Sequence, residues 1–488
     1  MSARRAAVAL LGVLGGCAVG PGYHRAPAVP AGTRVGAGTA SDTTRAFFDS
    51  LAAARAADPL PATAPTPLPP RVIAADSLAD LAWLDVLRDS TLIGLVATAL
   101  RENRDLAVAE GRIREFRAAA GVARAPLFPS LTLNGSASKN QIAIGAATVK
   151  YDAWRVTGDV AWELDFWGRT RRGLQAANAD LAAQDAAARA AVLSLVSDVA
   201  SGYLRLLELD QERAIAERTL ASRRTTLDLA RQRYARGVIS ELDVRQFEAQ
   251  VAVPAARLAQ VESARAEQEH SLNVLLGEAP AAVPRGGSLT RAARAAAVPD
   301  SLPSSLLDRR PDVRQAERSY AAAMARIGVA DAARLPTVTI AGSYGSQAPA
   351  TSGLFTPLTD IYQLQAGVSI PVFTGGRRVN EARAARARAE QARAQYEQTA
   401  LVALREAGDA LVGVRAARDQ AAAQDTQAKA LRRALELAQA RYQSGVANYL
   451  EVLDAERSLF DAELALSAAQ LEQATAAVRL YKALGGSW

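Results

Sequence analysis

Residues 154–165 read Trp-Arg-Val-Thr-Gly-Asp-Val-Ala-Trp-Glu-Leu-Asp, and apolar side chains alternate with polar ones along most of this stretch. Such alternation is typical of a β-strand with one apolar and one polar face. Trp154 and Trp162 share the apolar face, and their separation corresponds to roughly 20 Å of height in a tilted strand. Membrane β-barrels carry an outward apolar band of about 25 Å between two aromatic girdles. We therefore predict that this strand crosses a membrane beside a water-filled interior.

Similar alternation extends over four predicted strands, at about 130–140, 151–165, 337–346 and 361–373. Their apolar positions give a predicted lipid-facing set: Leu131, Leu133, Trp154, Val156, Val160, Trp162, Leu364, Val368 and Ile370. Soluble hairpins are the simpler alternative, but charges on strands of membrane-spanning length favour a barrel. Four strands cannot close a barrel, and lipid does not tolerate open strand edges. Several copies must therefore pool their strands, and the residue pattern allows a dimer or a trimer.

The two halves of the chain repeat at a nearly constant offset. Pro129 and Pro336 are 207 positions apart, and Arg233-Tyr234 and Arg441-Tyr442 are 208 positions apart. A constant offset across blocks of different character indicates an internal duplication. The predicted organisation is a signal peptide (1–16), a lipidated N-terminus with an extended linker (17–75), a first repeat (76–277), an equatorial segment (278–306), a second repeat (307–484) and a tail (485–488).

Each repeat contains one very long predicted helix, which at 1.5 Å per residue is about 100 Å long. Each long helix ends at a glycine turn, Gly237 or Gly445, where a positive φ stops a helix. The return helices are shorter, so each must stack on a second helix to regain the height. The long helices are predicted at 169–234 and 377–442, the return helices at 240–276 and 448–484, and the stacking helices at 91–123 and 311–333.

The first residues predict the compartment. Arg4 and Arg5 precede an apolar stretch at 6–14, which is typical of a secretion signal and too short to span a membrane. Leu-Gly-Gly-Cys at 14–17 resembles the bacterial lipoprotein cleavage box, so we predict that Cys17 is lipidated. No later segment offers about 18 uninterrupted apolar residues, so no transmembrane helix is predicted.

The composition argues against most catalytic and nucleic-acid-binding classes. The chain has two histidines, one cysteine and a net charge of +7 with acids and bases interleaved. So few histidines and cysteines exclude a Cys/His metal cluster or a Ser-His pair, and we predict no cofactor and no nucleic-acid partner. A coiled-coil scaffold would explain the helices but not the signal or the strands. A carboxylate-based envelope hydrolase using Asp159 and Asp165 is a further alternative, but both alternate with apolar positions and fit a water-facing surface.

In combination, several motifs resemble TolC-like outer membrane factors, in the lipoprotein subgroup that serves RND-type efflux pumps. The matching stretches include Cys17–Pro21, Glu163–Asp165, Arg310–Val313, Arg441–Asp454 and Leu480–Trp488. The resemblance implies a mixed fold, a membrane β-barrel joined to a long α-helical barrel. It implies a homotrimer that closes a twelve-stranded barrel, anchored in outer-membrane lipid with its tunnel extending into the periplasm. It also implies a passive exit duct working with a periplasmic adaptor and an inner-membrane RND transporter.

The resemblance further implies a periplasmic gate formed by Tyr442, Leu450, Asp454 and Arg457. Spacing alone places the last three on one stripe of a helix. At the 208 offset, Gln246 faces Asp454 and an alanine faces Arg457, so this charge pair exists only in the second hairpin. A solvated surface pair is the alternative interpretation.

The turns between the long and return helices are the ends farthest from the predicted membrane strands. We therefore predict that they meet the adaptor. The predicted docking residues are Gly237, Ile239, Gly445 and Ala447.

Overall fold

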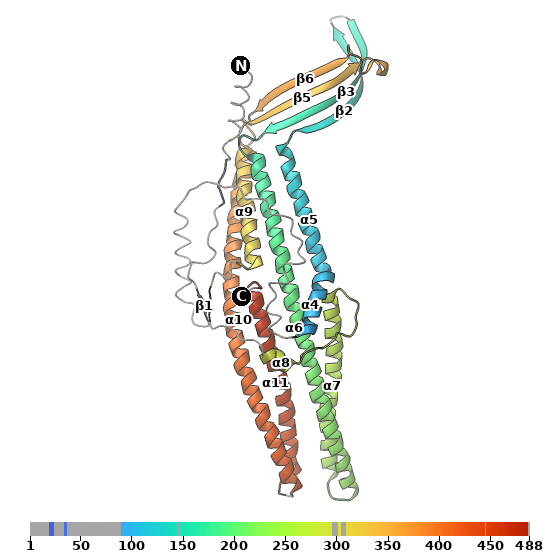
Figure 1. The fold of residues 1–488 in the computed structure, drawn as a ribbon, viewed down its shortest axis with the longest axis vertical. Helices are drawn as coiled ribbons and strands as arrows, with labels where there is room; N and C mark the ends of the chain where they lie inside the picture. The colour runs from blue at the N-terminus through green and yellow to red at the C-terminus, as the bar shows by residue number, and fades with distance from the viewer. Residues whose placement is uncertain are drawn as a thin grey trace.

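Helices form a long bundle with one small sheet at one end in the computed structural model of the protein (Figure 1). The structure describes residues 19–23, 34–36, 89–144, 147–294, 301–303, 309–444 and 446–486. The turns that join the long helices to their return helices lie at the end opposite the sheet (Figure 1). Cys17 and Gly445 lie outside the described residues.

The sheet is antiparallel, with the strand order β2-β3-β5-β6. Its strands are β2 (Ser130–Ile144), β3 (Ala147–Leu164), β5 (Thr337–Ala348) and β6 (Asp360–Ser369). β2 and β3 are longer than predicted because their pairing continues to Ile144 and Ala147. β6 is shorter than the predicted 361–373, and Pro371, which lacks an N–H for the ladder, follows its end. Among the described strands, β2 and β6 each have one free edge.

Two helices of 67 residues each, α6 (Arg169–Ala235) and α10 (Arg377–Gln443), run the length of the bundle. Each ends one residue beyond its predicted range. The carboxylate of Asp165 accepts hydrogen bonds from the backbone N–H groups of Thr170 and Arg171, at 3.1 and 2.9 Å. Because the first N–H groups of a helix have no partner within it, Asp165 stabilises the start of α6.

The shorter helices stack end to end along the long ones (Figure 1). In the first repeat, α7 (Glu241–Leu276) meets α4 (Ser90–Glu102) and α5 (Arg104–Arg124). In the second repeat, α11 (Tyr449–Ala483) meets α9 (Pro311–Ala332), where Arg310 Nη1 donates to the Ala483 carbonyl at 2.9 Å.

The single helix predicted at 91–123 is wrong, because Asn103 breaks it into α4 and α5. Asn103 has extended backbone angles (φ −63°, ψ 131°), and its side-chain oxygen accepts from the N–H groups of Asp105 and Leu106. Its Nδ2 donates to the Leu275 carbonyl of α7 at 2.9 Å. The same residue therefore caps α5 and joins it to the return helix.

The core follows the middle of α6. Val192, Val196, Val199, Tyr203 and Leu206, which follow one another at alternating spacings of four and three residues, are all buried. α6 also contains an 18-residue window apolar enough to cross a membrane by composition, but 56% of that window is buried within the structure. The hydropathy of α6 is therefore that of a core helix.

The equatorial segment at 278–306, for which no helix or strand was predicted, contains a short helix and a short strand. The helix is α8 (Leu289–Arg294), and Leu289 is packed in the main core. The strand β4 (Ser301–Pro303) pairs with β1 (Arg34–Gly36) from the N-terminal region. Three-residue strands carry little sequence periodicity, so this pairing was not predictable.

Candidate functional site

The register of the sheet brings the predicted lipid-facing residues onto one face. Leu131 lies opposite Val160, Trp162 opposite Ile340, and Val338 opposite Val368. Directly opposite residues share a face in an antiparallel pair. Eight of the nine predicted residues lie in strands on this face, and Ile370 follows the end of β6. We call this surface the apolar face.

Most of the apolar face is open to solvent in the isolated chain. Leu131, Leu133 and Leu364 are 75%, 80% and 81% exposed, whereas Val156 and Trp162 are half-buried. Trp162 donates from Nε1 to the Leu127 carbonyl at 3.2 Å, which fixes its indole at the base of the sheet. Large apolar side chains exposed in a contiguous row mark a surface that meets lipid or another protein.

Polar side chains occupy the opposite face of the sheet. Asp159 Oδ2 accepts hydrogen bonds from Asn134 Nδ2 at 2.5 Å and from Thr157 Oγ1 at 3.2 Å. Thr157 is only 3% exposed, so an arginine introduced there would not be freely hydrated in this structure. Asn134 on the same face is exposed, so it is the better position at which to compare an arginine on the polar face with an arginine on the apolar face.

The carboxylates of the hydrolase alternative have structural partners. Asp159 is bonded to Asn134 and Thr157, and Asp165 caps α6 and pairs with Arg171. Within the described ranges, no cluster of three His, Cys, Asp or Glu side chains could hold a metal ion. Neither carboxylate is therefore placed as a free acid or base beside the other.

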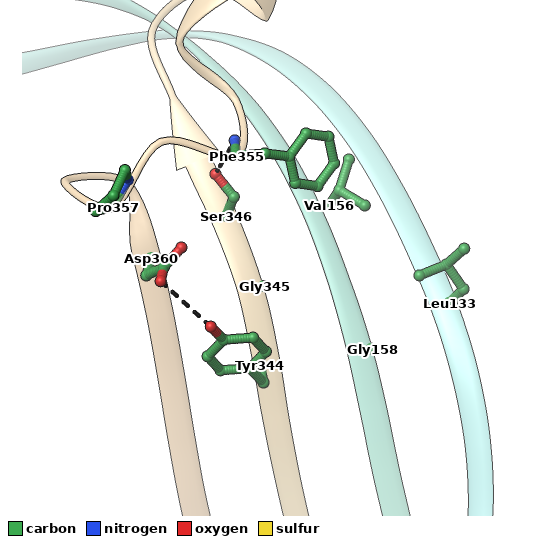
Figure 2. Close-up of a pocket in the computed structure, with 9 residues that line it drawn as sticks. All are labelled: Leu133, Val156, Gly158, Tyr344, Gly345, Ser346, Phe355, Pro357 and Asp360. Atoms are coloured by element: carbon green, nitrogen blue, oxygen red, sulfur yellow. Dashed lines mark hydrogen bonds between the residues drawn. The ribbon is translucent and has the colours of Figure 1, made fainter.

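A hollow of about 440 Å³ lies on the apolar face, beside the connection between β5 and β6. Figure 2 draws the residues that line it. Leu133, Val156 and Phe355 supply much of its apolar lining. The Phe355 N–H donates to Ser346 Oγ at 3.0 Å, and the Tyr344 hydroxyl donates to Asp360 Oδ2 at 3.2 Å. These bonds hold the connection against the sheet, and the hollow brings together no set of reactive groups.

The two turns at the other end of the bundle have matching geometry. Gly237 has φ +71°, as predicted, and the Val238 N–H donates to the Arg233 carbonyl at 2.9 Å. The equivalent bond in the second repeat runs from Val446 to Arg441 at 3.0 Å. Both bonds satisfy carbonyls at a helix end and turn the chain back sharply.

The residues most exposed at these turns are not the predicted docking residues. Ile239 and Ala447 are only half-exposed, and Ile239 packs against a small cluster that includes Phe247. The most exposed apolar residues are a pair that the prediction missed, Val238 (67%) and Val446 (71%). Their signal in the sequence is an apolar residue directly after the turn glycine in both repeats.

The predicted gate residues fall into two groups. Arg457 Nη2 lies 2.8 Å from Asp454 Oδ1, both side chains are more than 60% exposed, and Leu450 is 54% exposed on the same helix. Tyr442 instead contacts the first hairpin, where its hydroxyl accepts a hydrogen bond from Arg233 and its ring lies 5.6 Å from the guanidinium carbon. One of the predicted gate residues therefore makes a contact between the two hairpins.

Aromatic rings extend this contact between hairpins. The ring centroid of Tyr449 lies 5.0 Å from that of Tyr442 and 4.6 Å from that of Phe247. At the 208 offset, Phe247 faces an alanine and Tyr449 faces a glutamate, so neither ring belongs to the duplicated pattern. Positions at which the two repeats carry different residue types were therefore the sequence signal for residues that join the two hairpins.

The five described N-terminal residues dock beside the base of the sheet. The Val19 N–H donates to the Trp167 carbonyl at 3.0 Å, and Arg172 Nη2 donates to the Gly20 carbonyl at 3.1 Å. Gly20 has φ +105°, and a Cβ there would lie 2.5 Å from Gly328 Cα, so only glycine fits. This docking holds the chain close to the sheet two residues after Cys17.

Comparisons with known proteins show the family. The outer membrane efflux protein family matches residues 95–278 and 302–486, and the two matched ranges start 207 and end 208 positions apart. The chain belongs to this family. The double match has the same offset as the internal duplication, so each structural repeat corresponds to one copy of the family's unit.

Named relatives agree with this membership. The toluene efflux pump outer membrane protein TtgC of Pseudomonas putida is 34% identical over 420 residues, covering 84% of this chain and 86% of TtgC. The pyoverdine export outer membrane protein OpmQ of P. putida is 31% identical over 428 residues, with coverages of 86% and 91%. The solved outer-membrane channel OprN is 30% identical, with a TM-score of 0.77 and coverages of 87% and 99%.

Membership of the outer membrane efflux protein family confirms the predicted fold class, in which a barrel of strands is joined to a tunnel of helices. It also confirms an outer-membrane efflux channel as the function and excludes the scaffold and hydrolase alternatives. The protein is a channel and not an enzyme.

Proposed function

We propose that this efflux channel is the passive exit duct of a tripartite RND-type pump and that it acts as a homotrimer. The observation that carries the proposal is the sheet, which has two free edges and an exposed apolar face. A closed ring of strands is the arrangement that satisfies every strand edge in lipid. Three copies would supply twelve strands, with the β2 edge of one copy pairing with the β6 edge of the next.

Crosslinking between neighbouring edges tests this arrangement. Cysteines at Leu133 on β2 and Leu364 on β6 of a cysteine-free Cys17→Ser background should give covalent dimers and trimers in outer-membrane vesicles. The controls are the two variants with a single cysteine, at Leu133 or at Leu364. Covalent trimers from the double variant, with no covalent dimers or trimers from either control, would support edge pairing. Crosslinked species no larger than dimers would contradict the trimer.

The partners follow from the geometry of the tips. Val238 and Val446 are exposed at the end of the bundle farthest from the sheet, as a periplasmic adaptor would require (Figure 1). Photocrosslinkers at these two positions should capture the adaptor, which in turn binds the inner-membrane transporter. Capture only from positions in the segment near Gly286 would place the docking site at mid-height instead.

Cys17 is proposed to carry the lipid anchor, because it ends the signal and the residues just after it dock at the base of the sheet. Cys17→Ser should abolish labelling by radioactive palmitate while leaving some channel in the outer membrane, since a closed barrel also holds the protein in lipid. Persistent labelling of the variant would contradict the anchor.

The second tip hairpin is proposed to be the gate, with Leu450 as an apolar constriction and Asp454 braced by Arg457. Support comes from the ion pair between these two residues and its absence from the first hairpin. Replacing Asp454 and Arg457 together by alanine should raise single-channel conductance in planar bilayers. Unchanged conductance would make them ordinary surface charges.

A further inference from the structure

A buried junction joins the two tip hairpins, between the gate and the middle of the bundle. Arg223 of α6 lies in it and is only 3% exposed. Its Nη1 donates to the Gln250 carbonyl of α7 at 2.8 Å, and its guanidinium carbon lies 5.6 Å from the ring centroid of Phe460 on α11. The guanidinium therefore stands where both hairpins meet.

Several polar atoms at this junction lack hydrogen-bond partners. Among the described residues, Nε and Nη2 of Arg223 make no hydrogen bond, and neither does Oε2 of Glu456 on α11. Buried polar atoms without partners are rare and costly, more so when they are charged. A carboxylate and a guanidinium that could satisfy each other therefore lie in the same junction without pairing.

Glu456 lies on the same side of α11 as the Arg223 guanidinium, because Phe460, whose ring lies 5.6 Å from that guanidinium, follows Glu456 by one helical turn. Burial raises the pKa of Glu456, and the positive charge of Arg223 acts in the opposite direction. Burial lowers the pKa of Arg223, and Glu456 is the first of the groups that oppose this. Each group is thus the main electrostatic partner of the other, although no hydrogen bond joins them.

Nearer the turns, a second contact between the two hairpins is formed. Arg233 donates to the Tyr442 hydroxyl and lies against its ring. Arg233 follows Arg223 by ten positions, which corresponds to about 15 Å along α6 at 1.5 Å per residue. In the arrangement seen here, the tip contact is formed and the ion pair in the junction is not.

We infer that Arg223 and Glu456 are a conditional ion pair that stabilises a second arrangement of the hairpins, the one in which the gate is open. When α11 moves relative to α6 and Arg233 releases Tyr442, the carboxylate of Glu456 reaches the free side of the Arg223 guanidinium. Two discrete arrangements, each with its own contact between the hairpins, are what a two-state gate requires. This inference rests on the proposed gate in the second hairpin.

Single-channel recordings of the purified channel in planar bilayers test the pair. Arg233→Ala removes the contact of the closed arrangement and should raise the open fraction. In that background, Arg223→Gln and Glu456→Gln should each lower the open fraction by a similar factor, about threefold or more. The double variant should show no further loss, because each single change already removes the same pair.

Matched controls lie beside the pair. Arg224 is adjacent to Arg223 but exposed, and Asp461 is an exposed acid within electrostatic reach of Arg223. Arg224→Gln and Asp461→Asn should leave the open fraction unchanged. If Arg223→Gln fails to assemble, Arg223→Lys is used in its place. The open fractions of channels with arginine and with lysine at position 223 should then differ when Glu456 is present and be equal in Glu456→Gln.

Additive effects of Arg223→Gln and Glu456→Gln, or effects of the same sign as Arg233→Ala, would overturn the inference. The gate itself is tested separately by the joint replacement of Asp454 and Arg457. Altered conductance in that variant together with additive effects at the junction would keep the gate and remove the conditional pair. A different outcome would be unchanged conductance on replacing Asp454 and Arg457, together with non-additive effects of Arg223→Gln and Glu456→Gln on the open fraction. That outcome would place the gate at the junction and would contradict the proposed role of the tip.

Discussion

The two long helices have the same length and equivalent places in the duplication, but they are built from different side chains. α6 buries large residues along its middle and packs against helices of both repeats. α10 buries mainly alanine, with larger buried side chains only at Tyr396, Leu411 and Val414, and packs chiefly against α9 and α11. The duplication has therefore diverged: α6 supplies large side chains to the largest core cluster, whereas α10 contributes mainly small side chains to smaller clusters.

The two tip hairpins also differ in the contacts that hold them together. The first hairpin is closed by a capping box, in which Ser240 and Asp243 bond each other's backbone N–H groups, and by an apolar cluster around Phe247. The second hairpin has the exposed pair of Asp454 and Arg457, whereas the exposed Arg245 of the first hairpin pairs with Glu241 and Glu248. The difference suggests a division of labour in which one hairpin supports and the other moves.

The largest expected difference between the repeats lies in the core. Leu204 is 1% exposed, whereas Val412, its equivalent at the 208 offset, is 50% exposed. Leu204→Ala should lower the free energy of unfolding by about 2–5 kcal/mol, because it leaves a cavity. Val412→Ala should cost well under about 1 kcal/mol in the protomer. Denaturant unfolding in detergent measures both, and equal losses would remove the contrast between the helices.

In the sheet, the repeats are expected to behave alike. Val156 and Leu364 are equivalent at the 208 offset and lie on the same apolar face. Arginine at either position should cost about 2–4 kcal/mol in the bilayer and reduce the assembled trimer. Asn134→Arg, on the polar face, is the control and should assemble. Equal tolerance of all three variants on non-denaturing gels would reverse the assignment of the faces.

A buried acid in the middle of α6 gives the first repeat a dependence on pH that has no counterpart at the equivalent position of α10. Burial, and then the neighbouring Glu212, raise the pKa of Glu208 from 4.5 to about 8, while Arg205 and Arg257 oppose the shift. The equivalent position in the second repeat is Ala416. Since the folded state holds this proton more tightly, its contribution to stability is complete below pH 4.5 and is lost as the pH rises towards about 8.

Glu208→Gln should therefore flatten the decline in unfolding free energy between about pH 4.5 and pH 8. Asp210→Asn is a less suitable comparison because Asp210 is ion-paired with Arg265 and Arg285. Exposed Glu262→Gln is the matched control and should leave the slope unchanged. An identical slope in wild type and Glu208→Gln would show that Glu208 does not carry the proton.

Periodicity predicted the elements that repeat, and it failed where the structure depends on single residues. The strands and long helices follow from alternation and from uninterrupted helical stretches, because tens of residues contribute to each pattern. The break at Asn103 depends on one side chain that caps α5 and bonds α7, a partner about 170 positions away. Such a contact leaves no periodic trace.

The candidate site was predictable to a similar extent. The register of the sheet gathers the predicted apolar face because alternation fixes which residues share a face. The contacts of Tyr442 with Arg233 and Tyr449 were not predictable, because they join different hairpins. Their only signal lay in positions where the repeats differ, and reading the duplication for its exceptions would have identified Phe247 and Tyr449.

The smallest energetic effect belongs to the gate, yet it is the most direct test of the account. Exposed ion pairs such as that of Asp454 and Arg457 contribute only about 0.2–1 kcal/mol to stability, so overall folding should not change. Single-channel conductance of Arg457→Ala should nevertheless rise, and cells carrying it should become sensitive to large antibiotics such as vancomycin. Gln246→Ala, at the position equivalent to Asp454 in the first hairpin, should behave as wild type. Equal conductance of the wild type and both variants would contradict a gate formed by the second hairpin alone.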